Sequence, residues 1–374
     1  MPLADMSPAG TASDFAERAL AFARIHAGKP LPAFAANLNA KVEMLQVGEM
    51  TMPATINDGL PGDAWVCSPR ATYTDCATEE GGRYLPSWMA SGSRRLNKGI
   101  GDWLTDVGID RVVAINNWLL STNLYPSLRN VPLTMMIGEA RERWPDHAVW
   151  FRSLNPIDNA DWIAALSAKG FQLMVSRQVY LYEDLAALSI RHANLKRDLV
   201  QLGRTALRRV RDDAITENDY ARIARLYELL YMEKYSRFNP HYSAEFMRCW
   251  HRAGLLEFHG FRDASGMLQC VVGLFRQGTT FTSPIVGYDT SLPRQLGLYR
   301  LLTACAYEVA MEKGCRLNFS AGAAHFKRLR GGVPAIEYSA VYARHLPRNI
   351  RNAIGGLSLL TRRVGAPLLS RYKL

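Results

Sequence analysis

The chain has 374 residues, of which 48% are hydrophobic, and it carries a formal net charge of +11 at pH 7. This length leaves room for two domains with real cores, and no uninterrupted apolar run is long enough to span a bilayer. The 6 cysteines show no CxxC pair and no metal-ligand spacing, and the N-terminal MPLADMSPAGTASDF lacks a signal-peptide pattern, so we expect reduced thiols, no metal and a cytoplasmic protein.

The first half of the chain alternates predicted helices and strands. Periodic apolar residues and Gly stops predict helices over residues 12–29, 133–144 and 158–170, with helices interrupted by Gly and Pro over 79–108. Apolar and β-branched runs predict a short strand and turn over 64–73, a strand that enters a polar turn over 111–120, and strands over 147–154 and 171–184. Residues 30–50 contribute mostly loop in this interpretation.

A basic segment joins this half to the next. Its charged side chains are Arg191, Lys196, Arg197, Arg204, Arg208, Arg209 and Arg211. Such a bias indicates an anionic partner, which could be a nucleic acid, an anionic membrane surface or a phosphorylated co-substrate. No base-stacking aromatic residues are interleaved with these side chains and no nucleic-acid motif is visible, which speaks against nucleic acid.

The second half repeats the alternation. A helix is predicted over 217–236, three strands within 255–289, a helix over 297–313, a strand over 315–320, a short basic helix over 322–331 and a last strand over 335–346. No repeat of short fixed period is present, so two similar α/β halves meeting near residues 185–210 are the expected architecture.

The segment GYDTSLPRQLGLYRLL (287–302) places two arginines and a glycine where a strand gives way to a helix. A helix start presents unpaired backbone N–H groups and a partial positive charge, so with Arg294 and Arg300 it can hold phosphate groups. The alternative is that Gly297 serves only the turn and Arg294 is a solvated charge.

The order helix, antiparallel strands, phosphate turn, helix, strand, helix, strand resembles the GNAT acyltransferase fold. In the matching segment, Arg294 to Tyr299, Tyr299 stands where that family usually has a small residue, which leaves room for a donor other than free coenzyme A. The stretch FSAGAAHFKRLRGGVPAIEYSAVY resembles the C-terminal part of double-GNAT proteins related to the Fem-type aminoacyl transferases. Within that group, NNWLLSTNLYP and the basic tail resemble the bacterial ceramide synthase type of lipid N-acyltransferase.

The resemblance implies an α/β protein with two GNAT-like halves, each a mixed, mostly antiparallel sheet flanked by helices. We expect an acceptor-side half at residues 1–185, a basic connector at 186–210, an acyl-thioester domain at 211–346 and a basic, apolar tail at 347–374. The implied activity is transfer of an acyl group from acyl-coenzyme A or acyl-carrier protein to a primary amine of sphingoid type. Acyl-coenzyme A would then be a co-substrate, with no permanently bound cofactor.

Donor binding is assigned to the phosphate turn and the short basic helix after it. The predicted residues are Arg294, Gln295, Gly297, Leu298, Arg300, Lys327 and Arg328. N-acyl transfer also needs a base for the amine and a proton for the departing thiolate. Asp289 and His325 are the preferred bases, and Tyr299 is a candidate proton donor, although each could equally be a turn or packing residue.

Acceptor binding is assigned to polar clusters that follow a strand and a helix. The predicted residues are Asn116, Asn117, Trp118, Asn123, Tyr235 and Glu337. Amides and hydroxyls at a strand exit could bind an amino-alcohol, but they could also satisfy their own backbone in a polar turn.

The tail RNIRNAIGGLSLLTRRVGAPLLSRYKL mixes apolar clusters with arginines, and no acid follows Glu337. Such a stretch is typical of a segment that lies on an anionic membrane, although Gly355, Gly356, Gly365 and Pro367 predict that it is not one continuous helix. We therefore expect a protein peripheral to the cytoplasmic face of the inner membrane. Two alternatives stay open: a Fem-like transferase that uses aminoacyl-tRNA, and a non-catalytic protein that binds the membrane surface.

Overall fold

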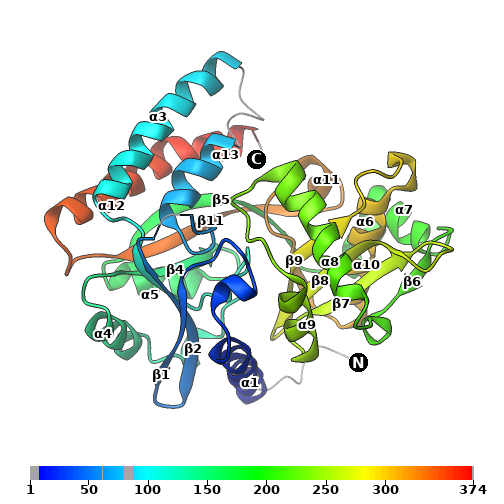
Figure 1. Cartoon of the computed structure of the whole chain (residues 1–374), viewed down its shortest axis with the longest axis horizontal. Helices are drawn as coiled ribbons and strands as arrows, with labels where there is room; N and C mark the ends of the chain where they lie inside the picture. Colours follow the sequence, from blue (N-terminus) through cyan, green and yellow to red (C-terminus); the bar gives the residue numbers. More distant parts are fainter. Residues whose placement is uncertain (1–7, 61, 80–86, 373–374) are drawn as a thin grey trace.

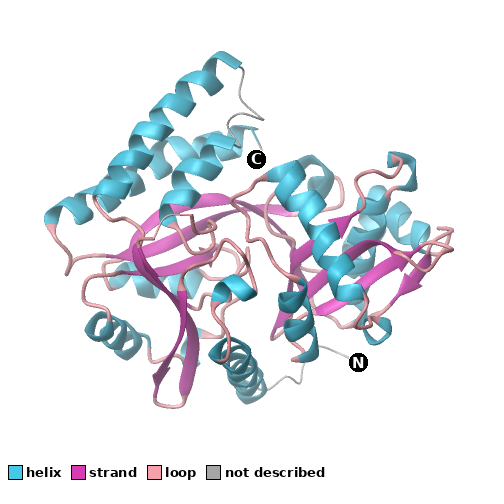
Figure 2. Ribbon diagram, in the orientation of Figure 1, coloured by secondary structure: helices cyan, strands magenta, loops and turns pink. Residues whose placement is uncertain are grey.

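The computed structural model describes residues 8–60, 62–79 and 87–372. Its central feature is an 11-stranded sheet with the order β1-β2-β3-β4-β11-β5-β10-β9-β8-β7-β6. Figure 1 shows helices on both faces of this sheet, and Figure 2 shows the strands running through the middle of the molecule. The predicted α/β class, with a mostly antiparallel sheet flanked by helices, is confirmed.

The strands are β1 (Lys41–Val47), β2 (Met50–Asp58), β3 (Arg111–Ile115), β4 (Ala148–Leu154), β5 (Gln172–Tyr182), β6 (Arg208–Val210), β7 (Glu257–Arg262), β8 (Leu268–Gln277), β9 (Thr280–Tyr288), β10 (Arg316–Asn318) and β11 (Val333–Tyr342). Two neighbouring pairs, β3 with β4 and β9 with β10, are parallel. The other pairs are antiparallel.

The α-helices are α1 (Pro8–Ala27), α3 (Ser87–Asp106), α4 (Leu133–Arg143), α5 (Ala160–Ala168), α6 (Leu185–Arg191), α7 (Ala193–Leu202), α8 (Asp219–Glu228), α9 (Ala244–Arg252), α10 (Leu298–Glu312), α11 (Ala324–Arg328), α12 (Arg348–Leu360) and α13 (Ala366–Tyr372). Short 3-10 turns are η1 (Leu31–Ala33), η3 (Leu128–Asn130), η4 (Asp212–Ala214) and η6 (Arg294–Leu296), and π-helical turns are η2 (Ala71–Asp75), η5 (Leu229–Tyr235) and η7 (Thr361–Gly365).

The last strand, β11, does not lie at an edge of the sheet. It pairs with β4 on one side and with β5 on the other, so the C-terminal part of the chain completes the sheet of the N-terminal part. β5 also pairs with β10, which joins the strands of both halves into one continuous sheet. The predicted boundaries at 185, 210 and 346 stay predictions.

Alternating side chains on the strands build separate cores on the two faces of the sheet. Val271 on β8 packs into one core with α8 and α9, whereas its neighbours Cys270 and Val272 pack into another core with α10. The same alternation on β4 sends Phe151 to the first core and Trp150 to a third, which lies under α3 and α12. This is the period-2 pattern of strands covered on both faces.

Helix α10 confirms the prediction for residues 297–313. Gly297 precedes it with φ +62° and Gly314 follows it with φ +60°, values in the left-handed region that favour glycine. Between them, Leu301, Leu302 and Cys305 are fully buried, as the apolar stripe predicts.

Three predictions of local structure are wrong. Residues 64–73 form the predicted turn and lead into η2, without the short strand that was expected there. β1 lies within residues 30–50, which were taken as mostly loop, and nearly all of β2 lies in a stretch for which no element was predicted. The tail is helical from Arg348 to Tyr372, through α12, η7 and α13. Glycine costs only about 1 kcal/mol in a helix, and burial of Ile354 and Leu357 offsets that cost. Pro367 follows the wide turn η7, where regular bonding is already interrupted.

Candidate functional site

Strands β9 and β10 run side by side for three residues and then separate. Thr280, Phe281 and Thr282 pair with Arg316, Leu317 and Asn318, and β10 ends there. β9 continues to Tyr288, paired on its other side with β8. A strand that loses a neighbour presents backbone N–H and C=O groups along the free edge, and these can bind an extended ligand. The separation of the two strands is therefore a built-in binding edge.

A cavity of about 310 Å³ lies at this separation, and we call it the fork cavity. It is lined by Trp65, Thr72, Cys76, Glu79, Ser121, Ser176, Arg177, Leu230, Tyr231, Tyr235, Ser236, Asn239, Ser283, Val286, Tyr299, Phe319, Ser320, Ala321, Gly322, Ala323 and Lys327. These residues come from both halves of the chain, so the cavity exists only in the assembled fold.

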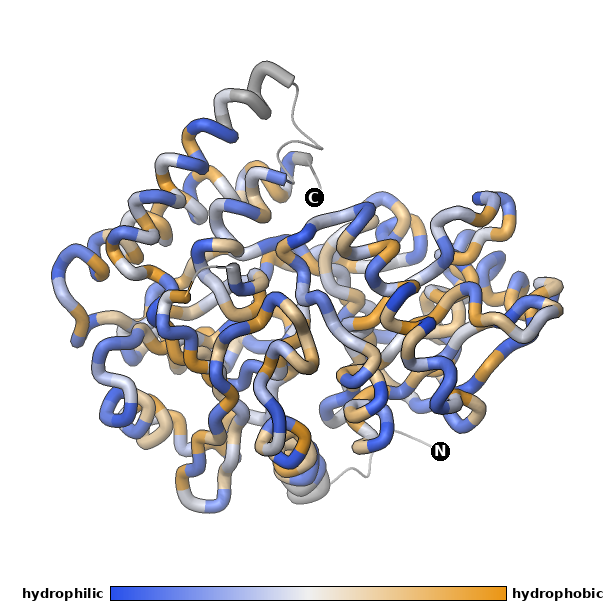
Figure 3. Tube along the Cα trace, viewed as in Figure 1, coloured by the Kyte–Doolittle hydropathy of each residue, from blue (hydrophilic) through white to orange (hydrophobic). Residues whose placement is uncertain are grey.

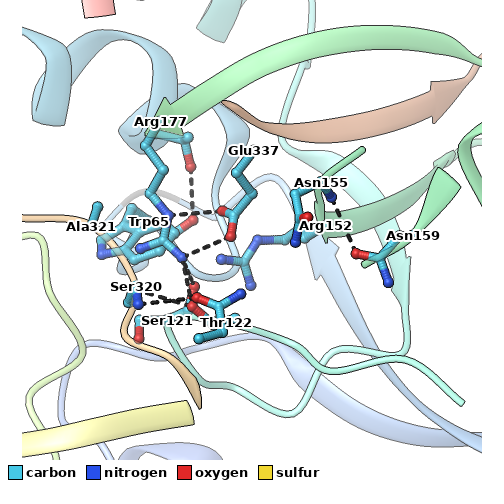
Figure 4. A network of polar contacts seen from close by, with 12 residues as sticks. Trp65, Ser121, Thr122, Arg152, Asn155, Asn159, Arg177, Ser320, Ala321 and Glu337 are labelled. Atoms are coloured by element: carbon cyan, nitrogen blue, oxygen red, sulfur yellow. Dashed lines mark hydrogen bonds and ion pairs between the residues drawn. The ribbon is translucent and has the colours of Figure 1, made fainter. Parts of the chain in front are cut away.

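An ion pair between neighbouring strands lies at the side of the fork cavity (Figure 4). Arg177 on β5 donates from Nε to Glu337 on β11 at 2.7 Å and from Nη2 to the second carboxylate oxygen at 3.2 Å. The same Nη2 donates to Thr122 at 3.0 Å and to the backbone oxygen of Ser121. Only 1% of the Glu337 side chain is exposed. Arg177 therefore links β5, β11 and the 119–124 loop while one edge of its guanidinium faces the cavity.

Two guanidiniums lie against the indole of Trp65. Arg177 and Arg152 each lie 4.9 Å from the centre of its rings. Arg152 is buried and donates to Asn117 at 3.0 Å. Stacked guanidiniums hold the indole in one orientation, which fixes the aromatic side of the cavity.

Lys327 on α11 closes the loop that follows β10. Its Nζ donates to the backbone oxygens of Phe319 (2.6 Å), Ser320 (3.2 Å) and Ala321 (2.7 Å). Burial, and then the positive charge of Arg177, hold the pKa of Lys327 well below its ordinary value. Three carbonyl acceptors use all three N–H bonds of a protonated amine, so this side chain positions the loop rather than offering donors to a phosphate.

Glu79 was not identified from the sequence. It follows η2 and lines the fork cavity, and its Oε2 is buried without a hydrogen-bond partner. A carboxylate oxygen in that position needs a donor or a cation to offset the cost of its burial. The only local signal was an acidic pair before Gly81, which is a common surface pattern. Among the described residues that line this cavity, Glu79 is the one that carries a carboxyl group.

Two tyrosines complete the site. Burial, followed by the proximity of other tyrosines, raises the pKa of Tyr299 well above its ordinary value, and burial raises the pKa of Tyr231. Both phenols are therefore neutral at physiological pH and keep an O–H to donate. Of the residues predicted from the sequence, the structure brings Tyr299, Tyr235 and Lys327 to the fork cavity.

The two predicted bases do not line this cavity. His325 is exposed on α11. Asp289 accepts from Arg222 at 2.8 Å and from the backbone N–H of Ser291 at 3.0 Å. Burial alone would raise the pKa of Asp289, but the hydrogen bonds from Ser291 and Arg222 outweigh it and lower the pKa, which weakens this carboxylate as a base. Their catalytic roles stay predictions.

The predicted phosphate turn is formed as a 3-10 turn, η6, that leads into α10. Arg294 and Gln295 are exposed there, whereas Leu298 is buried in the core under α10. Arg300 pairs with the buried Asp198 on α7, with 2.8 Å between Nε and Oδ1. Arg328 donates to the hydroxyl of Tyr180 at 2.9 Å. Donor binding by this turn stays a prediction, with Arg294 as its exposed guanidinium.

The predicted acceptor cluster at 116–123 is a buried loop. Asn116 (φ +57°) donates to the backbone of Leu124 at 3.0 Å and accepts from the Trp118 indole at 2.8 Å, while Asn123 accepts from the Trp118 N–H at 3.0 Å. Asn117 donates to Thr55 at 2.7 Å. Trp118 is fully buried among core aromatic rings. Asn116 and Asn123 bond within their own loop and Asn117 bonds to β2, while Ser121 is the part of the loop that lines the cavity. Acceptor binding by these amides stays a prediction.

Comparison with known proteins identifies the class. Residues 189–328 match the acetyltransferase (GNAT) domain family. L-PGS from Bacillus licheniformis is similar in structure, with 10% identity, a TM-score of 0.52, and coverage of 94% of this chain and 96% of that one. FemX is also similar, with 9% identity, a TM-score of 0.46, and coverage of 61% of this chain and 80% of that one. So is a tandem GNAT protein from the clavulanic acid biosynthesis pathway, with 14% identity, a TM-score of 0.37, and coverage of 62% of this chain and 75% of that one. No curated protein matches this chain.

The chain therefore contains a GNAT domain, and the protein is an acyltransferase enzyme. GNAT domains use acetyl- or acyl-coenzyme A as co-substrate. The fork of β9 and β10 lies within the matched region, since both strands fall between residues 189 and 328. The prediction of an acyltransferase is confirmed at this level.

Proposed function

We propose that this protein transfers an acyl group from a thioester bound at the fork of β9 and β10 to a primary amine bound in the fork cavity. One observation carries the proposal. The free edge of β9 and the buried Oε2 of Glu79, which has no partner among the described residues, belong to the same cavity. A thioester along the strand and an ammonium at the carboxylate would then meet inside it.

The proposed reaction needs two proton transfers, one from the attacking amine and one to the departing thiolate. Glu79 takes one proton from the ammonium, and the freed nitrogen attacks the thioester carbonyl to form the C–N bond. Backbone N–H groups on the edge of β9 stabilise the oxyanion of the tetrahedral intermediate. As the C–S bond breaks, Tyr299 gives its proton to the thiolate and regains one from the nitrogen. Direct attack needs no covalent acyl-enzyme.

For the acceptor, we propose a lipophilic primary amine, with a sphingoid-type long-chain base as the first to test. Trp65, Leu230 and Val286 contribute apolar surface beside the polar groups of the cavity. Such a lining supports an amine that carries an aliphatic chain, because mixed apolar and polar walls bind amphipathic ligands. The product would be an amide lipid of ceramide type.

The test measures thiol release from acyl-coenzyme A of increasing chain length, with and without long-chain amine, followed by mass spectrometry of the product. Amine-dependent thiol release with an amide product supports the proposal. Glu79→Gln keeps the shape of the side chain and removes the base, so we expect a 10²–10⁴-fold lower kcat.

The matched control is Glu49→Gln, which changes an exposed glutamate in the turn between β1 and β2. It should leave kcat unchanged. Equal activity of Glu79→Gln and the parent protein would remove Glu79 from the mechanism. Thioester binding without amine-dependent release would contradict the proposed acceptor.

A basic groove supports a second candidate, transfer from aminoacyl-tRNA. The groove has a volume of about 460 Å³ and is lined by Ala193, Lys196, Arg197, Val200, Gln201, Arg204 and Arg300. It adjoins the start of α10 and would suit either the phosphates of coenzyme A or an RNA backbone. Transfer of a labelled amino acid from charged tRNA, abolished by ribonuclease, would favour this candidate over the thioester donor.

A further inference from the structure

Two helical segments lie together on one face of the sheet, and neither contributes a residue to the lining of the fork cavity. Ile100 and Leu104 of α3 belong to the same hydrophobic cluster as Ile354 and Leu357 of α12. Figure 1 shows α3 beside the C-terminal helices α12 and α13 at the upper left of the molecule. The inner sides of both segments are therefore occupied by one shared core.

Their outer sides expose large apolar side chains. Leu96 and Trp103 on α3 are 63% and 45% exposed, and a spacing of seven places them on one face of the helix. In the C-terminal segment, Leu359, Leu360 and Val364 are between 42% and 52% exposed. Figure 3 shows hydrophobic and hydrophilic residues alternating along both segments. Apolar side chains at this exposure favour a partner that removes them from water.

The charges around these apolar residues are mainly positive. The exposed basic residues are Arg94, Arg95 and Lys98 on α3, and Arg348, Arg351, Arg362, Arg363 and Arg371 in the C-terminal segment. Asp102 and Asp106 are the acidic residues in the part of α3 whose side chains are described, and the sequence has no acid after Glu337. Leucine and tryptophan among arginines match the interface of an anionic bilayer, where acyl chains and phosphates are both present.

A groove beside the arginines gives a headgroup room to enter. It has a volume of about 890 Å³ and is lined by residues that include Arg362, Arg363, Gln172 and Tyr338. Two guanidiniums at one groove can both donate hydrogen bonds to the oxygens of one phosphate group. None of the helices in the described part of the chain is long and apolar enough to cross a bilayer.

We propose that α3 and the helices α12, η7 and α13 form a docking surface for an anionic lipid bilayer. The helices lie flat on it, with Trp103, Leu360 and Val364 in the interface and the arginines at the lipid phosphates. None of the residues that line the fork cavity belongs to these helices, so docking does not depend on the proposed transfer reaction.

The experiment is flotation of the full-length protein with phosphatidylcholine vesicles that contain or lack phosphatidylglycerol. We expect binding to the anionic vesicles that weakens as salt is raised. Arg362→Gln with Arg363→Gln should lower the partition coefficient about thirtyfold, because each arginine near the surface contributes about a factor of five. Trp103→Ser should lower it about tenfold.

Matched controls lie elsewhere on the surface. Arg24→Gln on α1 removes an exposed charge, and Met267→Ser removes an exposed apolar side chain in the turn between β7 and β8. Both should float like the parent protein. Circular dichroism establishes that each variant is folded.

Three outcomes would overturn the proposal. The first is absence of flotation with anionic vesicles. The second is equal flotation with neutral vesicles at every salt concentration. The third is equal loss in the controls and in the arginine and tryptophan variants. Self-association of the unlipidated protein that Trp103→Ser abolishes, without any vesicle binding, would assign the surface to a second copy of the chain instead.

Discussion

The ion pair between Arg177 and Glu337 permits a quantitative test of how the two halves are held together. Replacing Arg177 with Met keeps much of its volume but removes the donors at 2.7 and 3.2 Å from the Glu337 carboxylate. The glutamate side chain is 1% exposed, so water cannot replace these donors. Breaking a buried pair from one side costs about 3–5 kcal/mol, a large share of the roughly 5–15 kcal/mol that stabilises a typical protein.

The assay is urea unfolding followed by tryptophan fluorescence and circular dichroism, with the free energy taken from the linear extrapolation. Arg177→Met should lose about 3–5 kcal/mol. The double variant Arg177→Met with Glu337→Gln removes the uncompensated charge and should recover at least half of that loss. The matched control is Arg211→Met, which breaks the exposed pair with Glu312 at 3.1 Å and should cost about 0–1 kcal/mol. If Arg177→Met costs no more than this control, or if the double variant is no more stable than the single one, the buried pair does not hold the halves as argued.

Two further predictions concern a buried histidine and a close approach of backbones. Burial lowers the pKa of His26 to about 4, and both ring nitrogens lack partners. The unfolded chain then binds more protons between pH 6.5 and about 4, so stability should fall by about 3 kcal/mol as pH drops through that window. His26→Phe should flatten this part of the pH profile, and an unchanged slope would contradict it. A Cβ on Gly287 of β9 would lie 2.6 Å from the backbone of Leu226 and Tyr227, so Gly287→Ala should cost about 1–3 kcal/mol in urea unfolding. The control Gly356→Ala, whose Cβ meets nothing within 4 Å, should be neutral or stabilising; equal effects of the two would refute the steric reason.

The sequence pattern predicted those helices and strands whose ends and apolar faces are marked by residues within the element itself. Helix α10 was found because Gly297 and Gly314 bracket an apolar stripe, and the three strands β7, β8 and β9 were found because turn residues separate them. The continuous C-terminal helix was missed because Gly355 and Gly356 are poor helix formers, and the packing that offsets them involves β5, far away in the sequence.

Fewer of the residues that line the fork cavity were predicted from the sequence, because most of them come together only in the folded chain. Tyr299 and Tyr235 were among the predicted residues because they lie near recognisable turns. Glu79 and Arg177 carry no local signal, since their significance comes from meeting β9 and α11 in three dimensions. The predicted bases Asp289 and His325 lie close to the phosphate turn in sequence, but proximity along the chain does not place a side chain in a cavity wall.

The position of β11 bears on how the chain folds as it is synthesised. The strand fills the place between β4 and β5, yet it lies beyond Tyr182 by the whole length of the second half. At about 5–20 residues per second, an emerging chain would wait on the order of ten seconds with this gap unfilled. During that time the facing edges of β4 and β5 are open to pairing with other strands. A nascent N-terminal half is therefore the stage at which this protein is most exposed to aggregation, and the stage at which a chaperone would have most effect.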